Sequence, residues 1–241
     1  MILTVKKDPM GAAIRDYFEK GKAMTLKVTS TLFDDDEMPV AHLFRTLFEM
    51  SPIERQALSL CHGRILDVGA GAGCHSIALQ EQGADVTAID VSPLSVETMR
   101  RRGIEKVELA DFFTSQLPSE KYDTLLLLMN GLGIVGKIDK LPAFFYRLDE
   151  ILAPGGCVLT DNSDLRYIFE DEDGQFDPSD FDMYYGEVDY QMQYGKIKGN
   201  SIDWVYIDAD TLRQAAEQCG YKVEIVRQGE HYDYLAKITK A

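Results

Sequence analysis

The sequence has few of the features that mark metal-binding, disulfide-bonded or membrane-spanning proteins. Its four cysteines lie too far apart for a Cys-x-x-Cys pair, and its four histidines have no metal-ligand spacing with them. No run approaches the ~18 apolar residues of a membrane span, because the longest, Leu125 to Met129, has the length of a strand. The N-terminus also lacks a secretory signal pattern. We therefore expect reduced thiols, a cytoplasmic location and no membrane association.

Basic residues are scarce as well. The chain has 25 Lys and Arg against 40 Asp and Glu, a formal charge of −15 at pH 7, and shows no basic stripe. Contacts between such cations and phosphates supply most of the affinity for nucleic acids, so we expect no nucleic-acid partner. Apolar residues make up 45% of the 241 residues. That content supports one large domain, or one domain with an insertion.

The order of apolar patterns predicts an α/β protein. Short apolar runs alternate with amphipathic helical patterns from residue 63 onward, which is typical of a parallel sheet covered on both faces. Before that, Ile14, Tyr17 and Phe18 recur at helical spacing, and a second such pattern follows Pro39. The predicted segments are a helical cap (1–62), a Rossmann-like core (63–161), an inserted antiparallel β lid (162–206), and a C-terminal helix with the last two strands of the core (207–241).

Small and acidic residues follow the strands of the predicted core. In an open parallel sheet, ligands bind outside the carboxyl ends of the strands. The first strand leads into a glycine loop at Asp67–Gly73, the second ends in Asp90, and the third is followed by Asp111. Glycine lets backbone approach a ligand closely, and a helix that follows such a loop presents its amides. The sequence therefore predicts a site with three carboxylates around a glycine loop.

The glycine loop does not match the fingerprint of nicotinamide dinucleotides. A G-x-G-x-x-G motif fails from Gly69, because the sixth position is Cys74, and from Gly71, because it is Ser76. No Lys or Arg in the strand-end loops offsets a pyrophosphate. A cationic cofactor without phosphate fits better, and S-adenosylmethionine has that character together with two free ribose hydroxyls.

Each acid has an expected partner on this cofactor. Asp90 accepts hydrogen bonds from both ribose hydroxyls. Asp111 accepts one from the adenine amino group, with Phe112 against the ring. Asp67 and the Gly69 backbone face the ammonium of the methionine part. The cofactor is positively charged and the strand-end carboxylates are negatively charged, so the two attract each other.

These residues together resemble the Rossmann-like (class I) S-adenosylmethionine-dependent methyltransferases. The resemblance rests on ILDVGAGAG (residues 65–73) with Asp90 and Asp111, and covers about Arg64 to Asp161 well and residues 209–241 more loosely. It implies a doubly wound seven-stranded sheet whose last strand is antiparallel. It assigns the cofactor to Asp67, Gly69, Ala70, Gly71, Gly73, Asp90, Val91, Asp111, Phe112, Asn130 and Tyr17, the last closing over the site from the helical cap.

The same resemblance implies in-line methyl transfer to a small-molecule acceptor. Asn130 falls after the fourth strand, close to the methyl and the acceptor, and Trp204 and His231 are further acceptor-site candidates. Asp161 and Asn162 match the Asp-Asn pair that follows the fifth strand in magnesium-dependent members, but Asn130 stands where those have an acid after the fourth strand, so we expect no metal. Two alternatives stay open: an NAD(P)-dependent oxidoreductase, and a non-catalytic protein that binds S-adenosylmethionine.

Overall fold

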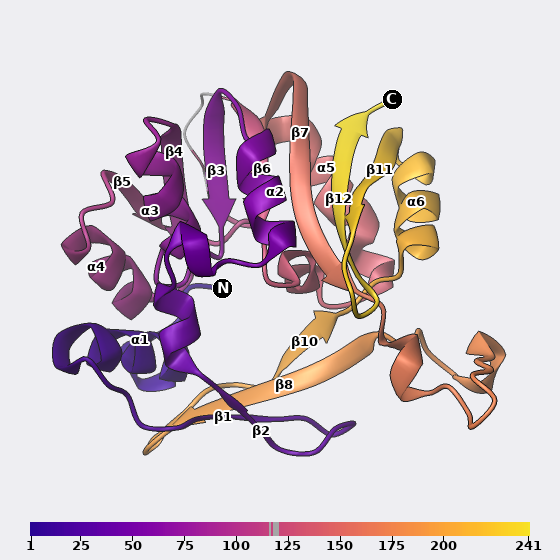
Figure 1. Ribbon diagram of the computed structural model, residues 1–241, viewed down its shortest axis with the longest axis horizontal. Helices are drawn as coiled ribbons and strands as arrows, with labels where there is room; N and C mark the ends of the chain where they lie inside the picture. Colours follow the sequence, from indigo (N-terminus) through magenta and orange to yellow (C-terminus); the bar gives the residue numbers. More distant parts are fainter. Residues whose placement is uncertain (116, 118–120) are drawn as a thin grey trace.

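The core of the protein is a seven-stranded mixed sheet (Figure 1). The computed structural model describes residues 1–115, 117 and 121–241. Along the sheet, the strands follow the order β11 (Tyr221–Gln228), β12 (Asp233–Lys240), β7 (Leu152–Ser163), β6 (Tyr122–Leu127), β3 (Arg64–Val68), β4 (Asp85–Asp90) and β5 (Lys106–Leu109). Strands β3 to β7 pair in parallel, and β12 is antiparallel to both of its neighbours. The predicted Rossmann-like class is confirmed.

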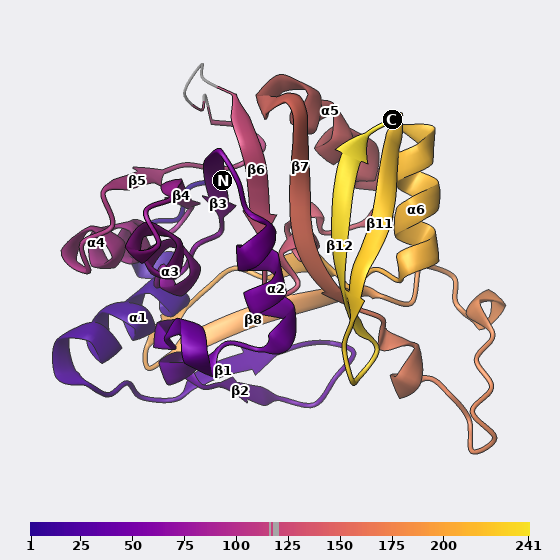
Figure 2. The ribbon, with the colours of Figure 1, turned by 45° about the horizontal axis from the view of Figure 1, so that its top comes forward.

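Helices cover both faces of this sheet (Figure 2). One face packs against α2 (Pro52–Leu60), α3 (Cys74–Glu81) and α4 (Pro93–Arg101), and the other against α5 (Leu141–Ile151) and α6 (Ala209–Gln218). Strand β6 shows why both faces are covered. Leu125 and Leu127 are buried among the α5 and α6 side chains, while Leu126 is buried among those of α2 and α3. Strand side chains alternate between faces, so an unbroken apolar run requires two cores.

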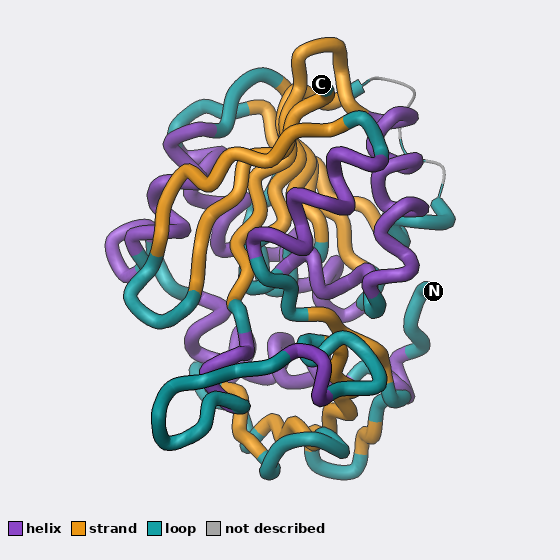
Figure 3. Tube along the Cα trace, turned by 90° about the vertical axis from the view of Figure 1, so that its right-hand side faces the viewer, coloured by secondary structure: helices purple, strands orange, loops and turns teal. Residues whose placement is uncertain are grey.

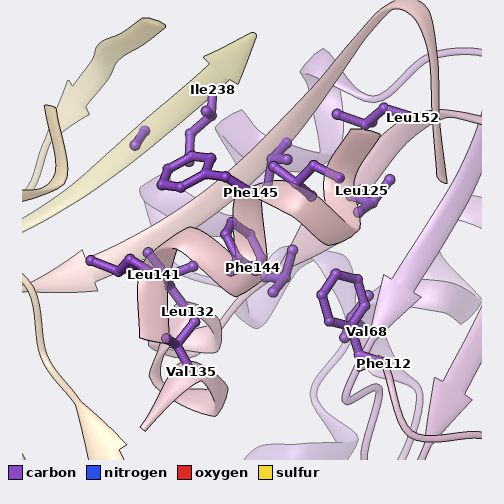
Figure 4. Close-up of a cluster of buried hydrophobic side chains, with 14 of the residues drawn as sticks. Val68, Phe112, Leu125, Leu132, Val135, Leu141, Phe144, Phe145, Leu152 and Ile238 are labelled. Atoms are coloured by element: carbon purple, nitrogen blue, oxygen red, sulfur yellow. The ribbon is translucent and has the colours of Figure 1, made fainter. Parts of the chain in front are cut away.

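The larger core cluster is centred on α5. Figure 4 shows Phe144 and Phe145 of this helix directed at the sheet, near Leu125 of β6 and Ile238 of β12.

The predicted start of α4 is also confirmed. Ser92 is its N-cap and Pro93 follows at the first helical position, as the sequence predicts. The Ser92 hydroxyl accepts a hydrogen bond from the Ser95 amide at 2.9 Å.

A second, antiparallel sheet lies across the carboxyl ends of the parallel strands (Figures 1 and 3). We call it the lid sheet. Its order is β10 (Ile202–Val205), β8 (Glu187–Tyr194), β1 (Leu26–Thr29) and β2 (Asp36–Met38), with β9 (Ile197–Lys198) paired to β8. The inserted strands after β7 confirm the predicted antiparallel insertion.

The N-terminal cap is only partly helical. Helix α1 (Pro9–Lys20) forms as expected and packs against Leu94 of α4. Residues 26–38, expected to be helical, instead contribute two strands to the lid sheet, and the pattern after Pro39 gives short 3-10 helices at Val40–Phe44 and Leu47–Glu49. The reason is a distant partner: β1 pairs with β8, more than a hundred residues away, and local spacing does not show such pairing.

Candidate functional site

A cavity of about 850 Å³ lies between the glycine loop and the lid sheet. A second cavity of about 470 Å³ lies beside it, and both are lined by Gly69, Asp90 and Trp204. The larger one also borders Asp67, Ala70 and Gly71, and the smaller one Val91, Asp111 and Phe112. The structure therefore brings Asp67, Asp90 and Asp111 together around two neighbouring cavities that share part of their walls.

The three glycines of the loop have left-handed backbone, which favours glycine. Their φ angles are +70° at Gly69, +59° at Gly71 and +81° at Gly73. A Cβ at Gly69 would have no atom within 4 Å, whereas one at Gly73 would lie 2.3 Å from the Ile104 Cδ1. The first two glycines thus keep space open at the cavity, and the third allows the loop to pack on the core.

Asp90 is held by backbone amides at the boundary of the two cavities. Its Oδ2 accepts a hydrogen bond from the Gly71 amide and its Oδ1 one from the Ser92 amide, each at 2.8 Å. Burial raises the pKa of Asp90 to about 6, although these two hydrogen bonds oppose the increase. Each carboxylate oxygen keeps a second lone pair that can accept from a ligand hydroxyl.

Asp67 lies deeper, at the end of β3. Its Oδ2 accepts a hydrogen bond from the Ser76 hydroxyl at 2.6 Å, and only 2% of the residue is exposed. Burial raises its pKa, against the effects of His75 and Ser76. The carboxylate therefore has one fixed donor and faces a cavity in which a cation would stabilise its charge.

Asp111 and Phe112 form the wall of the smaller cavity. The Asp111 Oδ1 accepts from the Phe113 amide at 2.9 Å, and its Oδ2 accepts from the Met1 amine. Burial alone would raise the pKa of Asp111, but the Met1 amine and the Phe113 amide lower it below its ordinary value. Phe112 is buried, with its ring edge-on to Phe113.

Asn130 follows β6 in a left-handed conformation, with φ at +54°. Its amide donates to the Asp161 Oδ1 at 3.0 Å, and its own Oδ1 is buried with no hydrogen-bond partner in the described part of the chain. Its neighbours Met129 and Gly131 line the larger cavity. Asn130 is thus at the edge of the cavity, fixed through its backbone to the end of β7.

Four predicted residues are absent from the described walls of the two cavities: Gly73, Asn130, Tyr17 and His231. Tyr17 packs on Phe44, with ring centroids 4.7 Å apart, and is absent from the described walls of both cavities. From α1 it is Met10 that borders both cavities. His231 is exposed in the turn between β11 and β12, where its amide donates to Asp233, and it too lies outside these walls. Trp204, in contrast, lines both cavities.

Sequence reasoning missed a buried charged cluster beside the glycine loop. The His75 Nε2 lies 2.8 Å from the Glu54 Oε1, which also accepts from the Arg45 guanidinium. Burial opposes the charged form of His75, but its hydrogen bonds with Cys74 and Glu54 outweigh this and raise its pKa to about 10. His75 borders the larger cavity as a paired cation, not as a free base. Arg45 and Glu54 gave no signal in the sequence, because only the fold brings them to α3.

Among the described residues, no group of three or more His, Cys, Asp or Glu side chains is arranged to hold a metal ion. Within the same residues, no helix combines the length and the apolar character needed to cross a bilayer.

The sheet order and the carboxylate-lined glycine loop define a Rossmann-like nucleoside-binding protein. A sequence model described as a methyltransferase domain matches residues 65–156. The chain is 50% identical to an S-adenosylmethionine-dependent methyltransferase from Bacteroides fragilis, whose crystal structure contains S-adenosyl-L-homocysteine. That match covers 100% of this chain and 98% of the other, with a TM-score of 0.94. The chain belongs to the S-adenosylmethionine-dependent methyltransferases.

More distant matches are shorter or show the fold alone. Ubiquinone biosynthesis O-methyltransferases from Xylella fastidiosa (strain 9a5c) and Histophilus somni (strain 2336) are 38% identical over 72 residues and 33% identical over 97 residues. These matches cover 28% and 34% of this chain, and the chain spans only 29% and 41% of the length of those relatives. The CcbJ methyltransferase from Streptomyces caelestis is 13% identical over 97% of this chain and 98% of its own, with a TM-score of 0.61.

Proposed function

We propose that this protein transfers a methyl group from S-adenosylmethionine to a small-molecule acceptor held under the lid sheet. The observation that carries the proposal is the continuity of the cavity. It starts at the glycine loop and Asp90 and continues beneath Tyr190 and Trp204 of the lid sheet. Its volume of about 850 Å³ is of the size that small ligands occupy. The related Bacteroides fragilis protein binds S-adenosyl-L-homocysteine, which supports the cofactor.

The proposed cofactor contacts follow the two cavities. The smaller cavity would hold the adenosine, with Asp111 accepting from the adenine amino group, Val91 and Phe112 beside the ring, and Asp90 accepting from the ribose hydroxyls. The methionine part would extend along Gly69, Ala70 and Gly71 into the larger cavity, where Asp67 faces its ammonium, while Gly73 packs the loop on the core behind them. Two backbone amides fix the Asp90 carboxylate, and the space at Gly69 is open; both observations support this placement.

The chain contributes to the reaction mainly by positioning. Bound S-adenosylmethionine would supply a methyl group on a sulfonium, and the sulfur would leave as a neutral thioether when the acceptor's lone pair bonds to the methyl carbon. Holding the two in line is worth ~7 to 11 kcal/mol in well-oriented reactions. The lid sheet and the residues after β6 and β7 would hold the acceptor, with Asn130 and Trp204 as proposed contacts. A base is needed only for an acceptor that must lose a proton.

The test separates this function from its alternatives. Calorimetric titrations with S-adenosylmethionine, S-adenosylhomocysteine and NADH come first, followed by methyl-release assays over small phenols, amines, thiols and carboxylic acids. We expect both sulfur compounds to bind, NADH not to bind, and one acceptor class to be methylated. Binding without methyl release to any acceptor would favour a non-catalytic role, whereas tight NADH binding alone would contradict the proposal.

Three further expectations stay predictions. The cytoplasmic location is compatible with four free cysteines, Cys61, Cys74, Cys157 and Cys219. The absence of a nucleic-acid partner rests on the charge of −15. The division into segments at residues 62, 161 and 206 follows composition, but the lid sheet draws strands from both sides of the core segment.

A further inference from the structure

The larger cavity has a strongly acidic wall. Six acidic residues border it, and none of its described lining residues is Lys or Arg. Its one basic residue, His75, is paired with Glu54. Asp67 and Asp90 belong to the proposed cofactor site. The other four acids, Asp34, Asp35, Asp36 and Glu37, come from the opposite side, at the turn between β1 and β2 and the start of β2.

We call these four acids the acidic turn; Lys27 of β1 lies opposite Glu37 in the strand pairing. No Lys, Arg or His forms an ion pair with residues 34–37 within the described part of the chain. The Asp36 Oδ1 accepts a hydrogen bond from the backbone amide of Glu37 at 2.7 Å. Carboxylates without ion pairs at the wall of a cavity give it a negative potential, which raises the local concentration of cations.

Aromatic side chains of the lid sheet lie next to this turn. Tyr190 of β8 and Tyr206 line the same cavity, and their hydroxyl oxygens are 3.0 Å apart. Burial raises the pKa of Tyr206, and the charges of Tyr167 and Asp36 add to the effect. Asp36 borders the same cavity as the two tyrosines. Trp204 completes the aromatic wall. Aromatic faces attract organic cations, most strongly where water is excluded.

We infer that the methyl acceptor is a small organic cation with an apolar body. Its positive nitrogen, a protonated amine or a quaternary ammonium, lies against the acidic turn and the Tyr190–Tyr206 pair. Its nucleophilic atom, at the other end, faces the glycine loop across the cavity. The inference rests on the proposed function, because it names the acceptor class for the same cavity. Anionic acceptors are disfavoured, since the described lining of the cavity offers them no Lys or Arg.

Three probes with the same ring and different charges test this. The protein is first saturated with S-adenosylhomocysteine and then titrated with 2-phenylethylamine, 2-phenylethanol and phenylacetate. We expect the amine to bind about fivefold to tenfold more tightly than the alcohol, and phenylacetate most weakly. The preference for the amine should shrink as salt rises from about 0.05 M to about 0.5 M, because all four acids of the turn are exposed to solvent.

Substitutions locate the source of the preference. The double variant Asp35→Asn/Asp36→Asn should bring the affinity for the amine within about twofold of that for the alcohol, with the alcohol itself unaffected. The control Asp173→Asn changes an exposed acid of the loop after residue 169, and it should bind all three probes as the unchanged protein does.

The outcomes separate this inference from the proposed function. Equal binding of the three probes, tighter binding of phenylacetate, or binding of none of them would overturn the inference, provided that S-adenosylhomocysteine binds. Failure of S-adenosylhomocysteine to bind would remove the proposed function and the inference together. Methylation of neutral acceptors with no preference for cations would leave the function standing and reject only the inference.

Discussion

Asp90 is the residue on which the cofactor assignment depends most directly. It touches both cavities, and two amides fix its carboxylate. Its position at the end of β4 follows from the sequence, because the strand pattern ends there. The amide of Gly71 that holds it comes from the neighbouring loop and is a consequence of the fold.

Replacing Asp90 with Ala should weaken S-adenosylhomocysteine binding by roughly 1.5 to 3 kcal/mol, the range for hydrogen bonds to a charged group. Calorimetry measures the change. The control Asp85→Ala alters an exposed acid at the other end of the same strand and should leave the affinity unchanged. Unchanged affinity in Asp90→Ala would show that the ribose lies elsewhere.

At the scale of elements, the glycine loop and the buried charged cluster connect β3, α2 and α3. The loop joins β3 to α3, and the cluster links α2 to α3. The loop repeats glycine at every second position, yet the surroundings of the glycines differ: Gly69 and Gly71 face open space, whereas Gly73 faces the core. The Arg45–Glu54–His75 cluster joins the segment before α2, α2 itself and the N-terminus of α3.

The glycine loop predicts that one substitution mainly weakens cofactor binding and another mainly lowers stability. Gly71→Ala places a methyl group in open space at the cavity, so we expect a stability loss of ~1 to 2 kcal/mol from the left-handed backbone and a larger loss of cofactor affinity. Gly73→Ala forces its Cβ against Ile104 and should cost ~2 to 5 kcal/mol of stability. Denaturant unfolding and calorimetry on both variants test this; equal losses of affinity and stability in the two would contradict it.

The buried cluster predicts a large effect of Glu54→Gln. That change leaves Arg45 and His75 buried without their anion, so the free energy of unfolding should fall by ~3 to 5 kcal/mol. The pKa of His75 is raised from 6.5 to about 10, so the stabilisation is present in full below pH 6.5 and is lost as pH rises through about 10. Urea unfolding at neutral pH measures the loss. The exposed Glu49→Gln should lose much less, and an equal loss there would argue against the cluster.

At the scale of the whole molecule, stability should depend on the charge state of Asp161. Burial raises the pKa of this carboxyl from 3.8 to about 7, although the Asn130 amide opposes the increase. The folded state therefore binds the proton more tightly than the unfolded chain does. The stability that this proton contributes is full below pH 3.8 and is lost as pH rises through about 7.

Asp161→Asn keeps the acceptor for the Asn130 amide and removes the charge. Its free energy of unfolding should exceed that of the unchanged protein by an amount that grows with pH, reaching up to about 4 kcal/mol above the folded pKa. Unfolding curves across this pH range test the slope. A difference independent of pH would show that Asp161 does not titrate in this way. The exposed Asp173→Asn serves as the matched control for the loss of one carboxylate.

The sequence by itself determined the core sheet and the strand-end residues. Short apolar runs, helix caps such as Ser92 and the spacing of Asp67, Asp90 and Asp111 are local patterns, and a parallel sheet then brings its carboxyl ends to one edge whatever else the chain does. These predictions needed no knowledge of which distant residues meet.

Only the tertiary structure decided how the lid sheet, α1 and the buried charged cluster are arranged around the cavity. Strand β1 forms because β8 supplies its hydrogen bonds. Met10 rather than Tyr17 reaches the cavity, because α1 packs on α4 with Tyr17 toward Phe44. Arg45, Glu54 and His75 meet because α2 docks beside α3. Each of these contacts joins segments that are separated along the chain. The energy of such contacts depends on burial and partners, which local sequence does not contain.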